Sequence, residues 1–379
     1  MLSFLNKKSS SFFGIDLGTT GIRVVQLAVE NGRVTLKNYV SLEAEKRINP
    51  DGTVVKKNIQ SLDKDTIESM KTILNSADVA DHKVAMSVPA SSTFTSIITF
   101  PRMPKEQIEN AVNYEARQYI PIPIEEVVFG WNIISNDRKK ILKKDTKSGV
   151  AQDNNKTVAG RSLEDKTRVL LIAIPKEISA KYLDIANSFN LDLVALETES
   201  FSLARSLIGQ REGAFIIVDV GYKMTGITIV DDGSVTESHS ISSVGGEELT
   251  KIIAHSFGVN EERANLLKRE IGLDQSSPDK KLAEVIIPIL GIIISEVKKN
   301  QQAYLHTNGK KISGIVLTGG SSRMPGLKEY LSKEMNLPVE IGNPFKMVSY
   351  DSRLENKLEG ISSSYAVAMG LALYNFEKD

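Results

Sequence analysis

The chain has 379 residues and no cysteine, and its 47 Lys and Arg residues balance 47 Asp and Glu residues to a formal net charge of zero. The missing thiols exclude disulfides, thiol catalysis and cysteine-ligated metals, and the even charge argues against nucleic-acid binding through a global positive field. The length predicts roughly two to three domains. The most apolar run, 285–294, is too short to span a bilayer and contains Pro288 and Gly291.

Two stretches about half a chain apart share a pattern of strand, tight turn, strand and hairpin turn. The first, 13–34, reads Gly-Ile-Asp-Leu-Gly-Thr-Thr-Gly at 14–21 and ends with Asn-Gly. The second, 215–235, reads Ile-Val-Asp-Val-Gly at 217–221 and ends with Asp-Gly. Asn-Gly and Asp-Gly are strong hairpin signals. The pattern therefore predicts two related lobes that arose by duplication.

Between the repeats, residues 82–190 are expected to form a small α+β subdomain inserted into the first lobe. Strands are predicted at 82–88, 93–100, 127–134 and 168–175, and helices from Pro104 to about Ile120 and at 176–190. Proline suits the first helical turn. The weakly patterned segment 135–166 is expected to be an inserted mobile loop.

The second lobe continues the alternation of strands and helices. Helices are expected at 247–257, 261–270, 283–304, 327–335 and 363–376, and a strand at 314–318. We divide the chain into the first part of lobe one (1–81), the insert (82–190), a connecting helix (191–212), lobe two (213–354) and a C-terminal connecting helix (355–379).

The two Asp-x-Gly turns are candidates for phosphate and metal binding. Glycines let backbone N–H groups approach an anion closely, and a carboxylate at a strand end can hold Mg²⁺ through water. Two such hairpins facing each other would clamp a metal–polyphosphate. The candidate phosphate-binding residues are Gly18, Thr19, Thr20, Gly21 and Gly221, and the candidate metal ligands are Asp16 and Asp219.

A second set of glycines precedes helices in lobe two. Gly319, Gly320 and Ser321 follow a strand and could pack against a nucleotide, although a plain strand-to-helix turn is favoured when they are taken alone. The same pattern, a glycine pair before a helix, recurs in Gly245, Gly246 and Glu247. Lys268, on the following helix, could reach a ribose or an adenine.

Together these features resemble the actin-like ATPase superfamily, which includes actin, Hsp70 chaperones, sugar kinases and FtsA. Residues 13–20 resemble its first phosphate loop, 217–221 its second, 316–322 its adenosine motif, and 197–204 and 365–373 its two connecting helices. The resemblance covers essentially the whole chain. It implies an α/β actin-like ATPase fold of two duplicated RNase H-like lobes, with ATP and Mg²⁺ between them.

The insert narrows the resemblance to the PilM family of type IV pilus assembly. The stretches that carry it are Phe-Pro-Arg-Met-Pro-Lys-Glu at 100–106, the segment 114–127, and 170–176, 244–246 and 296–304. This resemblance implies a cytoplasmic protein recruited to the inner face of the cytoplasmic membrane. Recruitment would occur because a groove formed with the insert binds the N-terminal peptide of the inner-membrane protein PilN. The long 135–166 loop departs from the family pattern.

Residues for the groove and for catalysis follow from the same resemblance. Tyr114, Tyr119, Ile120, Ile122 and Ile124 could line the groove, with core packing of the insert as the alternative. Glu197 matches the water-positioning acid of chaperone relatives, with Glu199 as a nearby competitor and a helix-capping or surface acid as the alternative for both. We expect slow ATP hydrolysis at most.

Three functions compete at this level. The first is an ATP-binding scaffold of the pilus assembly platform, acting in twitching motility with PilN and other platform proteins, with self-association left open. The second is an FtsA-like division protein, disfavoured because the chain ends at 375–379 directly after a core helix. The third is a small-molecule kinase, which would need sugar-binding polar residues where the insert offers an apolar surface.

Overall fold

The computed structural model describes residues 11–43, 46–48, 54–56, 59–62, 64–77, 79, 82–134, 166–242, 244–274 and 280–377. Apart from Lys166, the loop expected at 135–166 lies outside these residues. The chain divides into two compact units, one of Met1–Ala90 with Ala180–Asp379 and one of Ser91–Ser179. Within the described ranges, no helix is both long and apolar enough to cross a membrane.

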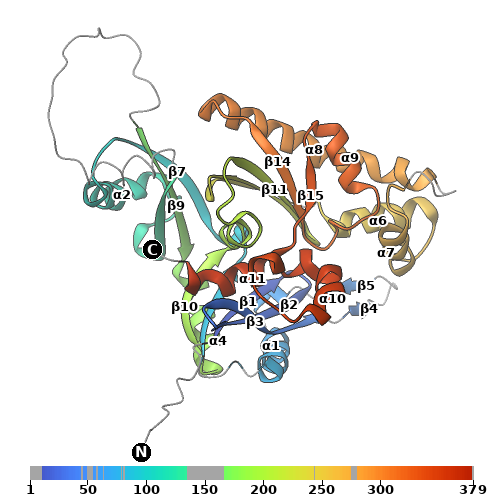
Figure 1. Cartoon of the computed structure of the whole chain (residues 1–379), viewed down its shortest axis with the longest axis horizontal. Coiled ribbons are helices and arrows are strands. Elements are labelled where there is room, and N and C mark those ends of the chain that lie inside the picture. The colour runs from blue at the N-terminus through green and yellow to red at the C-terminus, as the bar shows by residue number, and fades with distance from the viewer. Residues whose placement is uncertain are drawn as a thin grey trace, which may run out of the picture. The chain divides into compact units, whose positions relative to one another are not determined.

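The first unit contains two five-stranded sheets with the same topology (Figure 1). The first runs β10-β6-β1-β2-β3 and the second β13-β12-β11-β14-β15. In each, the central strand pairs antiparallel with the next strand along the chain and parallel with a later one. The strands are β1 (Phe12–Gly18), β2 (Gly21–Glu30), β3 (Arg33–Glu43), β6 (Lys83–Val88), β10 (Asp192–Thr198), β11 (Ala214–Val220), β12 (Met224–Asp231), β13 (Ser234–Ser242), β14 (Ile312–Thr318) and β15 (Val339–Ile341).

The predicted hairpin turns lie where the dipeptides place them. Asn31-Gly32 joins β2 to β3, and Asp232-Gly233 joins β12 to β13. All four residues have positive φ angles, between 48° and 79°, as a two-residue type I′ turn requires. The predicted α/β fold of duplicated lobes is thus confirmed.

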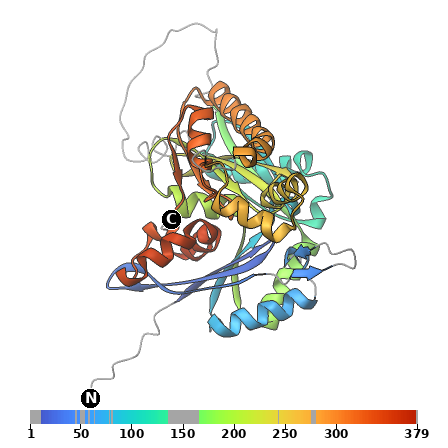
Figure 2. The ribbon, with the colours of Figure 1, turned by 90° about the vertical axis from the view of Figure 1, so that its right-hand side faces the viewer.

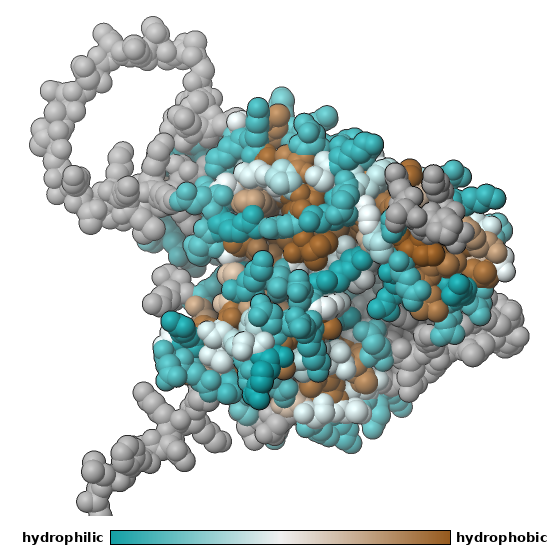
Figure 3. Space-filling model, turned by 45° about the vertical axis from the view of Figure 1, so that its right-hand side comes forward, coloured by the Kyte–Doolittle hydropathy of each residue, from teal (hydrophilic) through white to brown (hydrophobic). Residues whose placement is uncertain are grey.

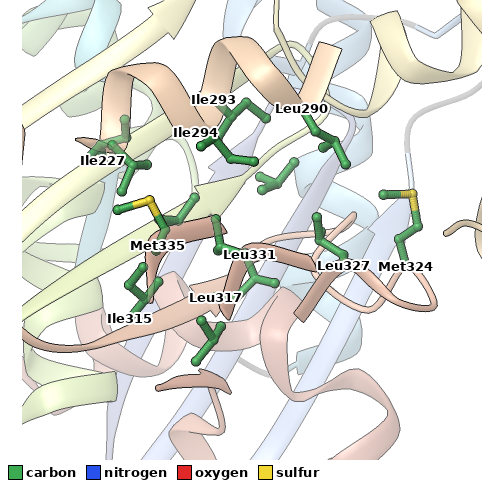
Figure 4. Packing of buried hydrophobic residues seen from close by; sticks show 14 of the residues in the cluster. Ile227, Leu290, Ile293, Ile294, Ile315, Leu317, Met324, Leu327, Leu331 and Met335 are labelled. Atoms are coloured by element: carbon green, nitrogen blue, oxygen red, sulfur yellow. The ribbon is translucent and has the colours of Figure 1, made fainter. Parts of the chain in front are cut away.

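Helices pack against these sheets. Between β3 and β6 of the first sheet, the chain forms a short strand pair, β4 (Lys46–Ile48) and β5 (Val54–Lys56), and then α1 (Lys64–Ala77). The second lobe has α6 (Gly246–Phe257), α7 (Glu261–Glu270), α8 (Lys280–Asn308) and α9 (Leu327–Met335). Figure 4 shows Leu290 and Ile293 of α8 lying with Leu331 of α9 in the core of this lobe. That core also contains the inward residues of β11 and β14.

Two helices connect the lobes at their base. The first, α5 (Glu199–Leu203), continues as a π-helical turn, η5 (Ala204–Ile208), and the second, α11 (Ala366–Leu373), follows α10 (Glu355–Ile361). Figures 1 and 2 both show α11 lying along the first sheet. Glycine permits this packing, because a Cβ at Gly370 would lie 1.9 Å from the Ser202 oxygen and one at Gly14 would lie 2.1 Å from the Ala368 oxygen.

The connecting helix begins later than expected. Residues 191–212 were predicted to be helical, but Asp192–Thr198 forms β10, which pairs parallel with β6. The physical reason is that β6 needs a neighbour on its outer edge, and 192–198 carries the half-buried residues Leu193, Ala195 and Leu196 that suit a strand there. The helix starts only at Glu199.

The second unit is a three-stranded antiparallel sheet with one helix. Its strands are β7 (Phe94–Pro101), β8 (Val127–Ile134) and β9 (Lys166–Pro175) in the order β7-β9-β8, and α2 is Lys105–Tyr119. The apolar face of α2, with Ile108, Val112 and Ala116, packs on the sheet. Trp131 lies on β8 opposite Leu171.

This unit is smaller than the insert expected at 82–190. Residues 83–88 form β6, which pairs parallel with β1 in the first sheet. At the other end, α4 (Lys176–Ser188) continues directly from β9, and from Ala180 onward it belongs to the first unit. Pairing between strands far apart in the sequence therefore sets the boundaries of the second unit, and the local sequence pattern does not reveal them.

Candidate functional site

The first unit contains a cleft of about 1110 Å³ lined by residues from both sheets. The β1–β2 turn enters it from one lobe, and the β11–β12 turn, α7 and the turn after β14 enter it from the other. Predicted residues that line the cleft are Asp16, Gly18, Thr19, Thr20, Asp219, Gly221, Gly246, Lys268, Gly319, Gly320 and Ser321. The fold thus brings together turns that lie about 100 to 300 residues apart in sequence.

Three of the predicted phosphate- and nucleotide-binding residues do not line the cleft. Gly21 begins β2, where its backbone pairs with Gly18. Gly245 lies against the β11–β12 turn, because a Cβ there would come within 2.6 Å of the Tyr222 oxygen. The Glu247 carboxylate pairs with Lys251 one helical turn away, at 3.1 Å. These residues support the loops that shape the cleft.

Asp16 is held in place by a hydrogen-bond relay from the neighbouring strand. The Ser87 hydroxyl donates to the Asp16 Oδ1 at 2.9 Å, and the Leu17 N–H donates to the Ser87 Oγ at 2.9 Å. Burial raises the pKa of Asp16, while Arg23 and the Ser87 hydrogen bond lower it. Sequence reasoning missed Ser87, because only the parallel pairing of β6 with β1 brings it to this carboxylate.

The second carboxylate, Asp219, lies against a glycine that no other residue could replace. Gly319 has a φ angle of +89°, and a Cβ there would lie 2.3 Å from the Asp219 Oδ1. The parallel pairing of β11 with β14 sets Asp219 opposite Thr318 and causes this approach. Burial and the Asp16 charge raise the pKa of Asp219 to about 6, with Arg23 acting in the opposite direction.

Glu197, the predicted catalytic acid, lies outside the cleft lining. Its carboxylate accepts from Arg205 Nη1 at 2.8 Å and Nη2 at 2.7 Å, and from the Ser202 hydroxyl at 2.8 Å. Arg205 also donates to the Gly370 carbonyl at 2.9 Å, which joins the two connecting helices. The structure therefore places Glu197 in a structural ion pair at the base of the lobes.

The competitor, Glu199, lines the cleft at the first residue of α5. Burial, followed by the charges of Asp16 and Asp219, raises its pKa from 4.5 to about 8. The change from strand to helix at Thr198 turns the two glutamates to different surroundings. Three carboxyl groups, those of Asp16, Asp219 and Glu199, thus influence one another in the cleft, and we call them the carboxylate cluster.

This cluster predicts a pH-dependent stability. An acid whose pKa is raised on folding binds its proton more tightly in the folded state, so the stabilisation present at low pH is lost as pH rises. With Glu199 raised from 4.5 to about 8, we expect the nucleotide-free protein to lose about 2–4 kcal/mol of unfolding free energy between about pH 5 and 8. Urea denaturation measures this loss.

The variant Glu199→Gln should flatten that dependence, because its side chain does not titrate. The matched control is Glu329→Gln, at an exposed position of α9, which should keep the wild-type pH profile. An equally steep profile in Glu199→Gln would contradict the assignment of the titration to this residue.

Lys268 is buried and ties two helices together. Its ammonium donates to the Gly246 carbonyl at 2.7 Å and to the Thr250 hydroxyl at 2.7 Å. Lys268 therefore ties α7, which carries it, to the first turn of α6. It also lines the cleft. Gly320, by contrast, has no heavy atom within 4 Å of an added Cβ, so its backbone borders open space in the cleft.

The predicted groove residues lie in the second unit and differ in exposure. Tyr114, 76% exposed, is the most exposed of the large hydrophobic side chains in the described residues, and Tyr119 is 41% exposed. Ile120 is only 6% exposed and belongs to the core of the unit, against which Ile122 and Ile124 also pack. For Ile120, core packing is therefore the role that the structure supports. In Figure 3, hydrophobic residues, coloured brown, form several areas on the face of the molecule that is shown.

Two sheets of one topology, each presenting an Asp-x-Gly turn to a shared cleft, define this chain as a protein of the actin-like ATPase fold. Solved structures agree: the PilM-PilN type IV pilus biogenesis complex matches with a TM-score of 0.72 at 22% identity, covering 97% of this chain and 98% of that one. MreB 5 of Spiroplasma citri bound to AMPPNP matches with a TM-score of 0.50 at 12% identity, covering 97% of each chain. A family model described as type IV pilus assembly protein PilM matches residues 14–376, so the chain belongs to that family.

The chain is also similar to curated cell division proteins over about half of its length. The cell division protein FtsA of Borreliella burgdorferi is 27% identical over 211 residues, which are 50% of this chain and 49% of that protein. FtsA of Buchnera aphidicola is 29% identical over 193 residues, covering 44% and 45%. The chain spans about half the length of the curated relatives it matches.

Proposed function

We propose that the cleft binds ATP with Mg²⁺. The observation that carries this proposal is the convergence of two Asp-x-Gly turns and the carboxylate cluster in one cleft. Burial, followed by repulsion from the Asp16 charge, raises the pKa of Asp219 to about 6 and that of Glu199 to about 8. A divalent cation would offset that repulsion, so the donor set fits the ion.

The arrangement also fits how magnesium is held beside phosphates. Among the described residues, no three His, Asp or Glu side chains form a metal-binding group. Mg²⁺ at a nucleotide takes one or two carboxylates together with phosphate oxygens and water. Asp16 and Asp219 would supply the carboxylates, and the ion would neutralise charge on the phosphates. The backbone N–H groups of 18–20 and 319–321 would face the phosphates.

Glu199 is the side chain of the cluster that could accept a proton from an attacking water. Since its pKa is raised to about 8, it is mostly protonated at neutral pH and is a poor base there. Slow hydrolysis follows from this, and the ATP state would act mainly as a conformational bias between the lobes.

We further propose that the protein is a cytoplasmic scaffold of the type IV pilus assembly platform. It would reach the inner membrane by binding the cytoplasmic N-terminal peptide of a PilN-like protein. Family membership supports the pilus role, and the similar solved structure is described as a complex of PilM with PilN. The exposed tyrosines Tyr114 and Tyr119 of the second unit are the side chains we assign to peptide contact, since exposed tyrosine commonly anchors such interfaces.

The decisive experiment measures peptide binding by fluorescence anisotropy, with and without Mg-ATP. We expect Tyr114→Ser to weaken binding of the labelled PilN N-terminal peptide at least about tenfold, because a truncated tyrosine anchor typically costs more than about 1 kcal/mol. The control is Ile292→Ser, which removes an exposed side chain from α8 in the first unit. Equal affinities for both variants would remove Tyr114 from the interface, and no binding by the wild type would refute the PilN proposal.

The FtsA likeness keeps a division role as the second candidate. A protein of that kind should fail to capture the PilN peptide in the same assay. A small-molecule kinase, also common in this superfamily, would show robust phosphoryl transfer to sugars or carboxylates, and such turnover would displace the scaffold proposal.

A further inference from the structure

A buried tyrosine hydroxyl on which charges of the carboxylate cluster act has no partner in the described residues. Tyr182 lies on α4 and is 1% exposed, and its hydroxyl makes no hydrogen bond within the described ranges. A buried hydroxyl left unpaired costs about 1–3 kcal/mol. Native proteins rarely keep such a group, and a catalytic role is one of the reasons for which they do.

The Glu199 carboxyl is an acceptor whose charge acts on this hydroxyl. The Glu199 carboxyl receives no hydrogen bond from any described residue, and only burial and the charges of Asp16 and Asp219 act on it. After burial, the charges of Glu199 and Asp16 are the strongest influences on the Tyr182 hydroxyl, and both raise its pKa. The phenol therefore stays protonated and remains a donor throughout the physiological pH range.

A single strand, β10, connects the helix that carries Tyr182 to the helix that begins at Glu199. Helix α4, which carries Tyr182, ends at Ser188, and β10 follows and leads directly to Glu199 at the first residue of α5. The flanking residues of Glu199 are already engaged, since the Thr198 and Ser200 hydroxyls contact each other at 3.3 Å and Ser200 accepts from Ser238 at 3.0 Å. The backbone of Glu199 is thus fixed, while its carboxyl is left without a donor.

We propose that Tyr182 is a positioning residue for Glu199: in the nucleotide-loaded protein its hydroxyl donates a hydrogen bond to the Glu199 carboxylate and orients it toward the hydrolytic water. This inference rests on the proposed function, because it requires ATP in the cleft. Tyr182 acts through Glu199 and touches neither phosphate nor metal. Such a donor would also favour the ionised carboxylate, which is the form that can accept a proton.

The test compares Tyr182→Phe with the wild type in single-turnover ATP hydrolysis and in ATP binding by calorimetry. We expect the hydrolysis rate to fall about tenfold while the dissociation constant for Mg-ATP stays within about twofold. The matched control is Tyr304→Phe, which removes the hydroxyl of another fully buried tyrosine, on α8 and outside the cleft lining. It should leave both quantities unchanged.

Other outcomes overturn the proposal in distinguishable ways. An unchanged rate in Tyr182→Phe, or an equal loss in Tyr304→Phe, would reduce Tyr182 to a packing residue. A parallel loss of ATP affinity and thermal stability in Tyr182→Phe would show the same. A wild-type protein that binds ATP without any turnover would refute the positioning role and leave the proposed ATP binding intact, whereas absence of ATP binding would refute the proposed function itself.

Discussion

Replacing Gly370 with alanine is expected to destabilise the protein by more than about 3 kcal/mol, the upper range for overpacking. An added Cβ would lie 1.9 Å from the oxygen and 2.4 Å from the carbonyl carbon of Ser202. Both contacts are with backbone, so no side-chain rotation relieves them. The connecting helices α5 and α11 would have to separate, and the hydrogen bond from Arg205 in η5 to the Gly370 carbonyl, which ties them together, would be strained.

The measurement is thermal and urea unfolding of the purified variant. The control is Gly291→Ala in α8, where a Cβ meets no heavy atom within 4 Å. Alanine there should stabilise the helix by about 0.5–1 kcal/mol, since glycine is a poor helix former. A Gly370→Ala protein that unfolds at the wild-type temperature would mean that the two helices do not cross as closely as described.

Replacing Asp219 with asparagine is expected to weaken Mg-ATP binding by more than about 100-fold. The reason is the loss of one of the two carboxylates that we assign to the ion, in a part of the cleft where a Cβ on Gly319 would reach the Asp219 Oδ1. Removing the same charge should raise the stability of the nucleotide-free protein near pH 8, because the Asp219 charge raises the pKa of Glu199. Calorimetry and urea unfolding measure the two effects.

The opposite signs make the experiment specific. A variant that loses ATP affinity because it is misfolded would also lose stability, whereas Asp219→Asn should gain it. The control is Asp192→Asn, at an exposed aspartate that begins β10, and it should change neither quantity. Intact Mg-ATP affinity in Asp219→Asn would refute the assignment of Asp219 to the metal.

Features encoded by local chemistry could be predicted from the sequence. Asn31-Gly32 and Asp232-Gly233 specify their turns through positive φ angles that few residues adopt. Since both turns sit at the same place in two similar segments, the duplicated lobes followed directly. The cleft residues at 18–20, 221 and 319–321 could be predicted for the same reason, because each belongs to a glycine-rich strand end.

Features that depend on strand pairing could not be predicted. Ser87 reaches Asp16 only because β6 pairs with β1, and that pairing also removes 83–88 from the expected insert. Glu197 and Glu199 are two residues apart in a similar local sequence, and only the end of β10 at Thr198 decides which one enters the cleft. Ile120 is apolar and next to prolines, but the packing of α2 determines that it is core.

The single tryptophan of the chain has an optical consequence. Trp131 lies on β8, in the unit that also carries Tyr114 and Tyr119, and ATP would bind in the other unit. Its half-buried indole is the one source of tryptophan emission, which is excited selectively at wavelengths that tyrosine does not absorb. A spectral shift on adding peptide would therefore report the second unit alone. A shift on adding nucleotide would show that binding in the first unit changes the surroundings of Trp131 in the second. No added label is needed to detect it.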